Sequence, residues 1–497
     1  MKVVSKTLTI VPVVTIVMVA LLLLVSPTST YDTIANLRLL VGDTFSSYYL
    51  ILGVVFVALI FGISVSKYGK IKLGEGDPEY STFTWGSMIF TSTMAADILF
   101  YSFHEWSYYY QGSTVAEAQL SSATYPLLHW GITPWSFYIL PAMAYAYLMH
   151  RKKVNMYRLS TACEIQGSPR KKSVLGTVID IFALLAMLAA SATTFSLATP
   201  LMSEILCRLL GIGHTTAAIS ILILTLIAVT YIIAVLFNMK GISQVAKICV
   251  YLFCATLICI IFNSNFQYTI ETGLTGVGNL LNNFLRLSTE TGSLRLADAE
   301  LGNTFTQDYT VFYWAYWISW ALCTPIFIAR ISRGRTLRQV GIGALVAGIT
   351  GTFTSFLVFG NFGLYNQVAG NFDMVGMIAE GAPYASAIVE LIATQTAIPT
   401  IILALLFLSM LAFYTSTFDT LTMVMSQYTC KKLTDNPPKY LKIFWGVVFI
   451  VLPIALLFTE GTLSSLQSLS IIAALPISVI FIRIVYQFFK NLHKETL

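Results

Sequence analysis

Six aromatic side chains occupy the nine positions from Phe312 to Trp320, inside a long apolar stretch of the sequence. On a helix, the rings of Tyr316, Trp317 and Trp320 would share one face. The negative face of such a ring attracts a cation by about 0.5–2 kcal/mol, and a quaternary ammonium group offers polar side chains no N–H to bind. The pattern therefore predicts an aromatic cage for a methylated cation. The alternatives are core packing and, near the end of the stretch, an interfacial belt of rings.

Another apolar stretch carries an acidic residue, Asp97, which is followed by Tyr101 and Tyr108 at i+4 and i+11. These three side chains would share a helix face. An ionisable residue inside a membrane is costly and marks a functional site by default. We therefore expect Asp97 to be a counter-charge or hydrogen-bond acceptor for a cationic ligand; the alternative is a hydrogen bond between helices. On the same segment, His104 is expected to be a packing residue and Glu105 a solvated cap.

A third polar group is formed by the hydroxyls of Thr415 and Ser416 in "AFYTSTFDTLT". Hydroxyl oxygens in a broken helix can ligate Na⁺, although they also satisfy backbone groups in many membrane helices. This pattern leaves the coupling ion, Na⁺ or H⁺, open. The cysteines show no metal-ligand spacing, and the motifs of metalloproteases, hydrolases and P-loop ATPases are absent. We expect neither an enzyme nor a bound metal or cofactor.

The composition shows which kind of structure holds these residues in place. Of the chain, 56% is hydrophobic and 10% is charged, which is far from the composition of a soluble domain. The apolar runs are roughly 20 residues long, enough to span a bilayer as helices and too long for barrel strands. The sequence predicts an all-α integral membrane protein. Its net charge of +6 comes from lysines and arginines in short loops, which indicates topology and not nucleic-acid binding.

The apolar runs predict twelve transmembrane helices. They lie at residues 7–26, 47–66, 84–110, 128–150, 174–206, 215–238, 244–263, 310–332, 340–361, 397–428, 442–458 and 464–488.

The loops between these segments alternate in charge. One set contains "SKYGKIK", "HRKKVNMYR" and "ARISRGRTLR", and the other set contains no lysine. By the positive-inside rule the first set faces the cytoplasm. This places both termini on the cytoplasmic side of the cell membrane. In the long external segment 264–309, apolar residues of "GVGNLLNNFLRLS" fall near helical spacing and predict a short amphipathic helix at the membrane surface.

The stretch "TVFYWAYWISWALCTPIFIARISRGRTLRQ" closely resembles the signature of the betaine/choline/carnitine transporters, in which a tryptophan-rich helix runs into an arginine-rich cytoplasmic loop. "LLHWGITPW" and "GTVIDIFALLAMLAASATTFSLATPL" match as well, so the likeness covers nearly the whole chain. The resemblance implies secondary active transport, and it makes a channel or a membrane-embedded enzyme the weaker interpretation.

The family fold implies two inverted five-helix repeats, spans 3–7 (residues 84–263) and spans 8–12 (residues 310–488). Two extra helices at 7–66 precede them, and the external segment 264–309 lies between them. The resemblance also implies a homotrimer in the lipid bilayer.

The site implied by the resemblance lies at mid-membrane between the third and eighth spans. The family's central cage falls on Tyr316, Trp317 and Trp320, with an outer ring at Tyr309. With the residues singled out above, the candidate substrate-binding residues are Tyr316, Trp317, Trp320, Tyr108, Asp97, Tyr309, Trp130 and Tyr101, and the weaker ion-binding candidates are Thr415 and Ser416.

The substrate signals conflict. Asp97 occupies a place where choline-type members carry an aspartate, whereas "SLATPL" is similar to the carnitine/γ-butyrobetaine exchangers. An ionised aspartate would repel the carboxylate of betaine or carnitine and attract the net positive charge of choline. We therefore expect choline first, with a carnitine/γ-butyrobetaine exchanger or a glycine betaine symporter as the alternatives.

Overall fold

The computed structural model describes residues 4–496, apart from 93–94, 155–157, 165–172, 214–216, 237–241, 293–304, 432–435 and 459–462. In these residues the only β-structure is two isolated bridges, Val4–Cys430 and Lys72–Thr336. The helices up to the external segment are α1 (Lys6–Val25), α2 (Pro27–Thr44), α3 (Ser46–Val65), η1 (Lys67–Lys70), α4 (Thr82–Ser92), α5 (Ala96–His104), η2 (Glu105–Tyr109), α6 (Val115–His129), α7 (Ile132–Ala146), η3 (Tyr147–Arg151), α8 (Leu159–Ala162), α9 (Val174–Leu210), α10 (Ala217–Leu236), α11 (Ile242–Asn263) and α12 (Phe266–Thr289). The remaining helices are η5 (Thr306–Val311), α13 (Phe312–Trp320), α14 (Thr324–Ile331), η6 (Gln339–Gly343), α15 (Ala344–Ser355), η7 (Phe356–Gly360), α16 (Asn361–Val368), α17 (Met374–Ala379), α18 (Tyr384–Gln395), α19 (Pro399–Thr429), α20 (Lys439–Phe458) and α21 (Leu463–Thr496).

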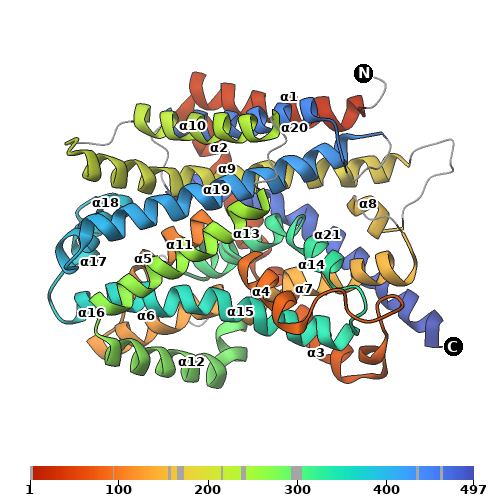
Figure 1. Ribbon diagram of the computed structural model, residues 1–497, viewed down its shortest axis with the longest axis horizontal. Helices are drawn as coiled ribbons and strands as arrows, with labels where there is room; N and C mark the ends of the chain where they lie inside the picture. The colour runs from red at the N-terminus through yellow and green to blue at the C-terminus, as the bar shows by residue number, and fades with distance from the viewer. Residues whose placement is uncertain are drawn as a thin grey trace.

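Most of the long helices run side by side along the long axis of the molecule (Figure 1). Among the described residues, seven helices are long and apolar enough to cross a bilayer, and two bent pairs raise the number to nine. The chain is therefore a multi-pass, all-helical membrane protein, as its composition predicts. Each of the twelve predicted ranges contains helix, but several of these helices are shorter or broken and do not reach the length of a full span.

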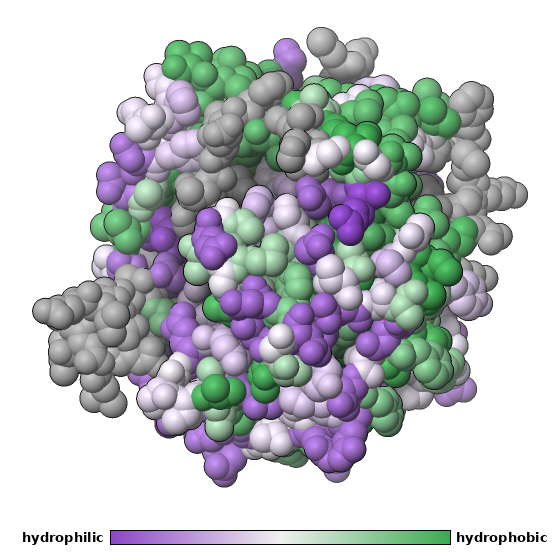
Figure 2. Space-filling view, turned by 90° about the vertical axis from the view of Figure 1, so that its left-hand side faces the viewer, coloured by the Kyte–Doolittle hydropathy of each residue, from purple (hydrophilic) through white to green (hydrophobic). Residues whose placement is uncertain are grey.

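Both ends of the chain lie at the same end of the molecule. Helix α1 begins and α21 ends at the right-hand side of Figure 1. Two hydrogen bonds tie the start of α1 and the loop after η3 to the end of α19: the backbone N–H of Ser5 donates to Thr429 (2.7 Å), and Arg158 donates to the carbonyl of Cys430 (2.5 Å). Figure 2 shows the opposite end, where hydrophilic residues gather in the middle of the face and hydrophobic residues lie toward its rim. This distribution suits a molecule whose two ends meet water and whose flanks meet lipid.

The predicted third and eighth spans are broken helices. Between α4 and α5 the backbone is extended at Ala95 (φ −127°, ψ 162°). The η5–α13 segment and α14 are bent by 55° relative to one another. Pro325 in the first turn of α14 lacks a backbone N–H and its ring crowds the preceding turn, which explains the second break. Breaks of this kind leave helix ends and backbone polar groups at membrane depth, where a ligand can meet them.

Several helices differ from the sequence-based expectation. The fourth span, expected at 128–150, is divided by Gly131 into α6 and α7. The amphipathic helix is present as α12, and at 24 residues it is longer than predicted. Helices α2, α6, α17 and α18 lie in segments expected to be loops. Their residues are less uniformly apolar than a membrane span, so a search for long apolar runs does not detect them.

Candidate functional site

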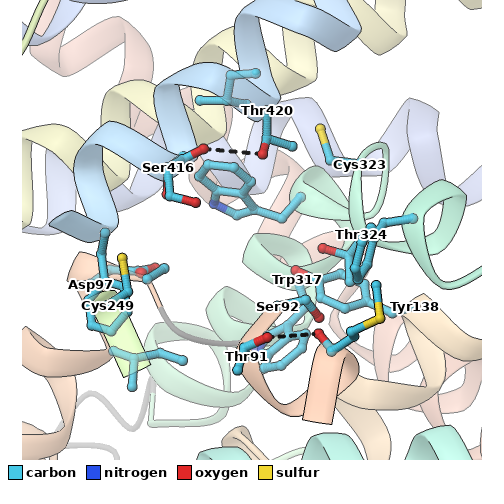
Figure 3. A pocket seen from close by; sticks show the side chains of 18 of the residues that line it. Thr91, Ser92, Asp97, Tyr138, Cys249, Trp317, Cys323, Thr324, Ser416 and Thr420 are labelled. Atoms are coloured by element: carbon cyan, nitrogen blue, oxygen red, sulfur yellow. Dashed lines mark hydrogen bonds between the residues drawn. The ribbon is translucent and has the colours of Figure 1, made fainter. Parts of the chain in front are cut away.

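A cavity of about 310 Å³ lies between the two broken helices and helices α7, α11 and α19. Figure 3 shows its lining, with Asp97 and Cys249 on one side, Ser416 on α19, and Trp317 and Tyr138 opposite. Six of the ten predicted residues line it. They are Asp97, Trp130, Tyr316, Trp317, Trp320 and Ser416.

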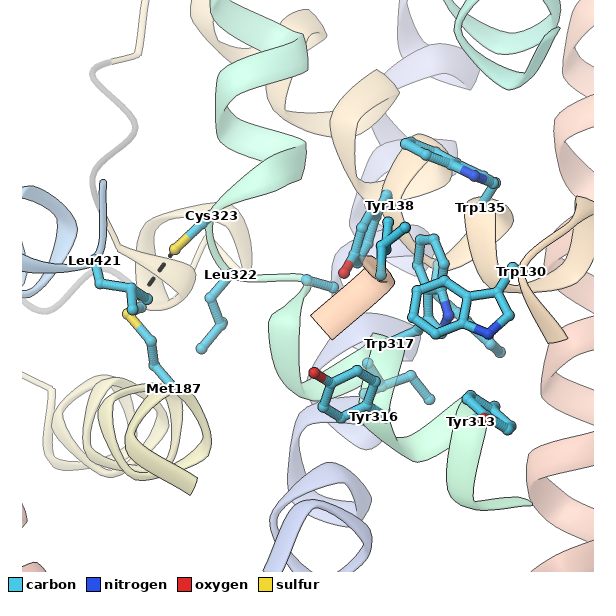
Figure 4. Packing of buried hydrophobic residues seen from close by; sticks show 14 of the residues in the cluster. Trp130, Trp135, Tyr138, Met187, Tyr313, Tyr316, Trp317, Leu322, Cys323 and Leu421 are labelled. Atoms are coloured by element: carbon cyan, nitrogen blue, oxygen red, sulfur yellow. Dashed lines mark hydrogen bonds between the residues drawn. The ribbon is translucent and has the colours of Figure 1, made fainter. Parts of the chain in front are cut away.

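Trp317 lies at the centre of the aromatic wall. Its ring centroid is 5.6 Å from that of Trp130, 5.4 Å from that of Trp135 and 4.7 Å from that of Tyr138, at tilted or edge-on angles. Figure 4 shows these rings, contributed by α7, the turn before it and α13. At such angles neighbouring rings do not stack face to face. More than one ring face can therefore contact a ligand. The indole Nε1 atoms of Trp317 and Trp320 have no hydrogen-bond partner among the described residues.

Trp135 and Tyr138 line the cavity and were not among the predicted site residues. They lie three positions apart on α7, which places them on one helix face. That spacing is visible in "WSFY" and could have indicated a second aromatic wall. The spacing alone could not show that this face of α7 meets α13.

Asp97 lies in the first turn of α5, at the break in the third span, and is 5% exposed. A carboxylate is favoured there because the first backbone N–H groups of a helix point toward it. The hydroxyl of Tyr316 donates a hydrogen bond to Asp97 Oδ2, and the same hydroxyl lies 2.5 Å from the hydroxyl of Thr194 on α9. The other oxygen, Oδ1, is buried without a hydrogen-bond partner of ordinary geometry in the described part of the chain. Asp97 thus has one oxygen to which no other described side chain donates a hydrogen bond.

Three of the predicted substrate-binding residues lie outside the cavity. The rings of Tyr108 and Tyr309 stack on each other (centroids 5.2 Å apart), and Tyr384 of α18 packs against Tyr108 at 5.3 Å. Tyr101 is buried between this cluster and the cage, with its ring 5.7 Å from that of His104 and 5.6 Å from that of Trp130. The helix-face argument grouped Tyr101 and Tyr108 with Asp97. It could not show that these two rings pack against other rings and do not line the cavity.

The expectations for His104 and Glu105 have different outcomes in the structure. His104 is fully buried, with Nδ1 2.7 Å from the carbonyl of Phe100 and Nε2 2.9 Å from the hydroxyl of Tyr108, as expected for a packing histidine. The expectation for Glu105 was wrong. Glu105 is fully buried and is not a solvated cap, and the hydroxyl of Tyr109 and the indole N–H of Trp130 donate hydrogen bonds to its carboxylate.

The two ion-binding candidates do not lie equally in the cavity. Ser416 lines it, whereas the hydroxyl of Thr415 donates to the carbonyl of Leu411 in its own helix (2.9 Å). Residues 93–94, which lie at the break in the third span, are outside the described residues. Of the two candidates, the structure therefore brings Ser416 to the cavity.

A glycine of α15 makes room for one wall of the cage. A Cβ atom on Gly348 would lie 2.6 Å from three ring atoms of Trp135, a distance that real contacts do not reach. We expect Gly348→Ala to displace the indole of Trp135 toward the cavity, at an overpacking cost of about 1–3 kcal/mol. The variant should bind substrate about tenfold more weakly. Gly62→Ala, where a Cβ meets nothing within 4 Å, is the matched control and should leave binding unchanged. Equal affinities for wild type and Gly348→Ala would show that the Trp135 wall is not used.

Two broken helices with aromatic side chains thus lie beside a carboxylate at membrane depth. The family described as "BCCT, betaine/carnitine/choline family transporter" matches residues 7–497. The chain belongs to this family. It is accordingly a membrane transporter of the quaternary ammonium class and not an enzyme.

Relatives within the family carry different substrate names. The chain is 28% identical over 453 residues to a carnitine transporter of Acinetobacter baumannii, an alignment that covers 88% of this chain and 80% of the relative. It is 28% identical to a high-affinity choline transport protein of Escherichia coli, over 92% of this chain and 67% of that protein. It is also 28% identical to a glycine betaine transporter of Bacillus subtilis, over 95% and 91%. Overall identity therefore does not separate the three substrates.

Proposed function

We propose that this BCCT transporter carries choline by alternating access, with the trimethylammonium group held in the cavity beside Trp317. The observation that supports choline is the carboxyl group of Asp97, which lines the same cavity and whose Oδ1 accepts no hydrogen bond from another described side chain. Choline has a hydroxyl that can donate to such an oxygen and a net positive charge that a carboxylate attracts. Its methyl groups suit the faces of Trp317 and its neighbouring rings.

The alternatives are a carnitine/γ-butyrobetaine exchanger and a glycine betaine symporter. Each of these substrates carries a carboxylate of its own. At an effective dielectric constant of about 20, two like charges 5 Å apart repel by roughly 3 kcal/mol. Within the described residues that line the cavity no lysine or arginine offsets this repulsion. Asp97 therefore favours the substrate without a carboxylate.

The finer architecture is part of the proposal. It comprises twelve spans in two inverted repeats, 84–263 and 310–488, after two helices at 7–66 and with segment 264–309 between the repeats. The first helix of each proposed repeat is broken, as α4–α5 and α13–α14, which supports a relation between the halves. Basic loop residues lie near both chain termini, since Arg151 forms an ion pair with Glu495 and Arg158 donates to the carbonyl of Cys430, which also pairs with Val4. This supports cytoplasmic termini. A homotrimer in the plasma membrane and coupling to Na⁺ or H⁺ are proposed from the family resemblance alone.

The test is uptake of labelled choline into proteoliposomes that contain the purified protein. We expect saturable uptake that excess unlabelled choline abolishes and that carnitine, γ-butyrobetaine and glycine betaine reduce only weakly. An uncharged isostere, 3,3-dimethylbutan-1-ol, should not compete, because it has the shape of choline without the charge that the rings and Asp97 attract. Uptake that carnitine blocks as well as choline does would instead support the exchanger. Repeating the assay without sodium, and then with a pH gradient, would identify the coupling ion.

A further inference from the structure

A buried carboxylate lies directly behind the aromatic wall. Glu105 in η2 is 0% exposed and accepts two hydrogen bonds: from the hydroxyl of Tyr109 to Oε1 (2.8 Å) and from the indole N–H of Trp130 to Oε2 (2.6 Å). The hydrogen bond to a carboxylate is charge-assisted and stronger than one between neutral groups. Among the described residues, no lysine or arginine forms an ion pair with Glu105.

The hydrogen bonds of Glu105 continue from Tyr109 to His129 and Thr310. The Tyr109 hydroxyl also lies 2.7 Å from Nδ1 of His129, and Nε2 of His129 lies 3.0 Å from the hydroxyl of Thr310. When Tyr109 donates to Glu105, its oxygen accepts from Nδ1–H of His129, and Nε2 then accepts from Thr310. Every member is satisfied in this arrangement, and a fully satisfied buried network is rigid. The carboxylate is thus held in place from the side away from the cavity.

Trp130 is the only indole of the cavity wall, within the described part of the chain, that bonds to a charged acceptor. Those of Trp317 and Trp320 have no partner there, and that of Trp135 bonds to the hydroxyl of Thr352 at 3.4 Å. Trp130 is also held through its backbone, because the hydroxyl of Thr352 donates to its carbonyl (2.6 Å). The residue lies at the end of α6, in the turn before α7, where its backbone N–H still donates to the carbonyl of Pro126 (3.0 Å).

The geometry points to Glu105 as the positioning residue that fixes the ring of Trp130 against Trp317 in the substrate cage. This inference rests on the proposed function only for the identity of the ligand. Loss of the carboxylate removes the charged acceptor of the indole N–H in a buried site, whereas the Tyr109 hydroxyl can still donate to Nδ1 of His129. The indole ring is then held less firmly and can rotate away from the cavity. The bound cation loses one ring face. Glu105 itself touches neither the cavity nor the substrate.

The experiment is a double-mutant cycle on purified protein, with the dissociation constant of labelled choline as the readout. We expect Glu105→Gln to weaken binding about tenfold, because the neutral amide oxygen of glutamine is a weaker acceptor for the indole N–H than a carboxylate. Trp130→Phe should weaken binding by a similar factor, and the double variant should be no weaker than either single one. The control pair is Glu105→Gln with Trp320→Phe. The indole of Trp320 has no hydrogen bond to Glu105, and no ring contact joins Trp320 to Trp130 among the described residues, so there the two factors should multiply.

Fluorine NMR of protein labelled with 5-fluorotryptophan supplies a readout that needs no ligand. The signal of Trp130 is identified by its loss in Trp130→Phe, and Glu105→Gln should shift it while leaving the signal of the distant Trp445 unchanged. If Glu105→Gln does not fold, Glu105→Asp replaces it, since a shorter carboxylate keeps the charge and withdraws the acceptor. An unshifted Trp130 signal, or a Glu105 effect that multiplies with Trp130→Phe, overturns the inference. A wild type that binds none of the trimethylammonium compounds overturns the proposed function and leaves the NMR outcome decisive for Glu105.

Discussion

Trp317→Ala is expected to abolish choline binding over the concentration range in which the wild type is saturated. The ring of Trp317 contacts Trp130, Trp135 and Tyr138, so its removal takes away one cation-binding face and the support of three others. A desolvated cation–π contact is worth about 2 kcal/mol, which corresponds to a loss of about 30-fold from this ring alone. The measurement is equilibrium binding of labelled choline to detergent-purified protein.

The control for Trp317→Ala is Trp317→Phe, which keeps an aromatic face of smaller size. It should retain part of the affinity and bind more strongly than the alanine variant. Thermal unfolding of both variants separates a lost contact from a lost fold, because truncation of a buried tryptophan costs about 3–5 kcal/mol of stability in itself. Wild-type affinity in a folded Trp317→Ala variant would show that the cavity beside α13 does not hold the ammonium group.

Asp97→Asn is expected to remove the preference for choline over substrates that carry a carboxylate. Asparagine keeps the size of the side chain and its hydrogen bond from Tyr316, but it carries no charge. Choline uptake should fall at least about tenfold, whereas competition by γ-butyrobetaine and glycine betaine should be unchanged or stronger. The measurement is the ratio of the inhibition constants in proteoliposomes that contain wild type or variant protein.

Tyr316→Phe is the matched control for Asp97→Asn. It removes the hydroxyl that donates to Asp97 and leaves both the ring and the carboxylate in place. If charge is the property that selects choline, Tyr316→Phe should keep the order of substrates and change affinity by no more than about threefold. A preference for carnitine that is the same in wild type and in Asp97→Asn would assign the chain to the exchangers.

Much of this molecule could be predicted from local sequence properties. Long apolar runs predict membrane helices without knowledge of their neighbours, because the bilayer is the partner of each helix. The face shared by Tyr316, Trp317 and Trp320 follows from the helix period, and Asp97 is conspicuous because a charge is costly at that depth. These four residues line one cavity, as the sequence indicated.

Three of the candidate residues lie outside the cavity for a common reason. Tyr108, Tyr309 and Tyr101 were assigned by face and by resemblance, and they pack outside the cavity. Helix spacing predicts in which direction around the helix axis a side chain points. It does not state how far along that axis a cavity extends, and this depends on which rings of other helices fill the space.

The sequence by itself determined the class of the protein, the family and the chemistry of its central helix, because composition, period and motif are properties of neighbouring residues. Only the tertiary structure decided that Trp135 and Tyr138 complete the cage and that Glu105 is buried behind it. The partners in these contacts are brought together from different helices, with Trp130 bound to a carboxylate 25 positions away and Trp317 packed against rings of α7. No spacing rule covers such pairs, because the distance between them is set by how whole helices pack and break.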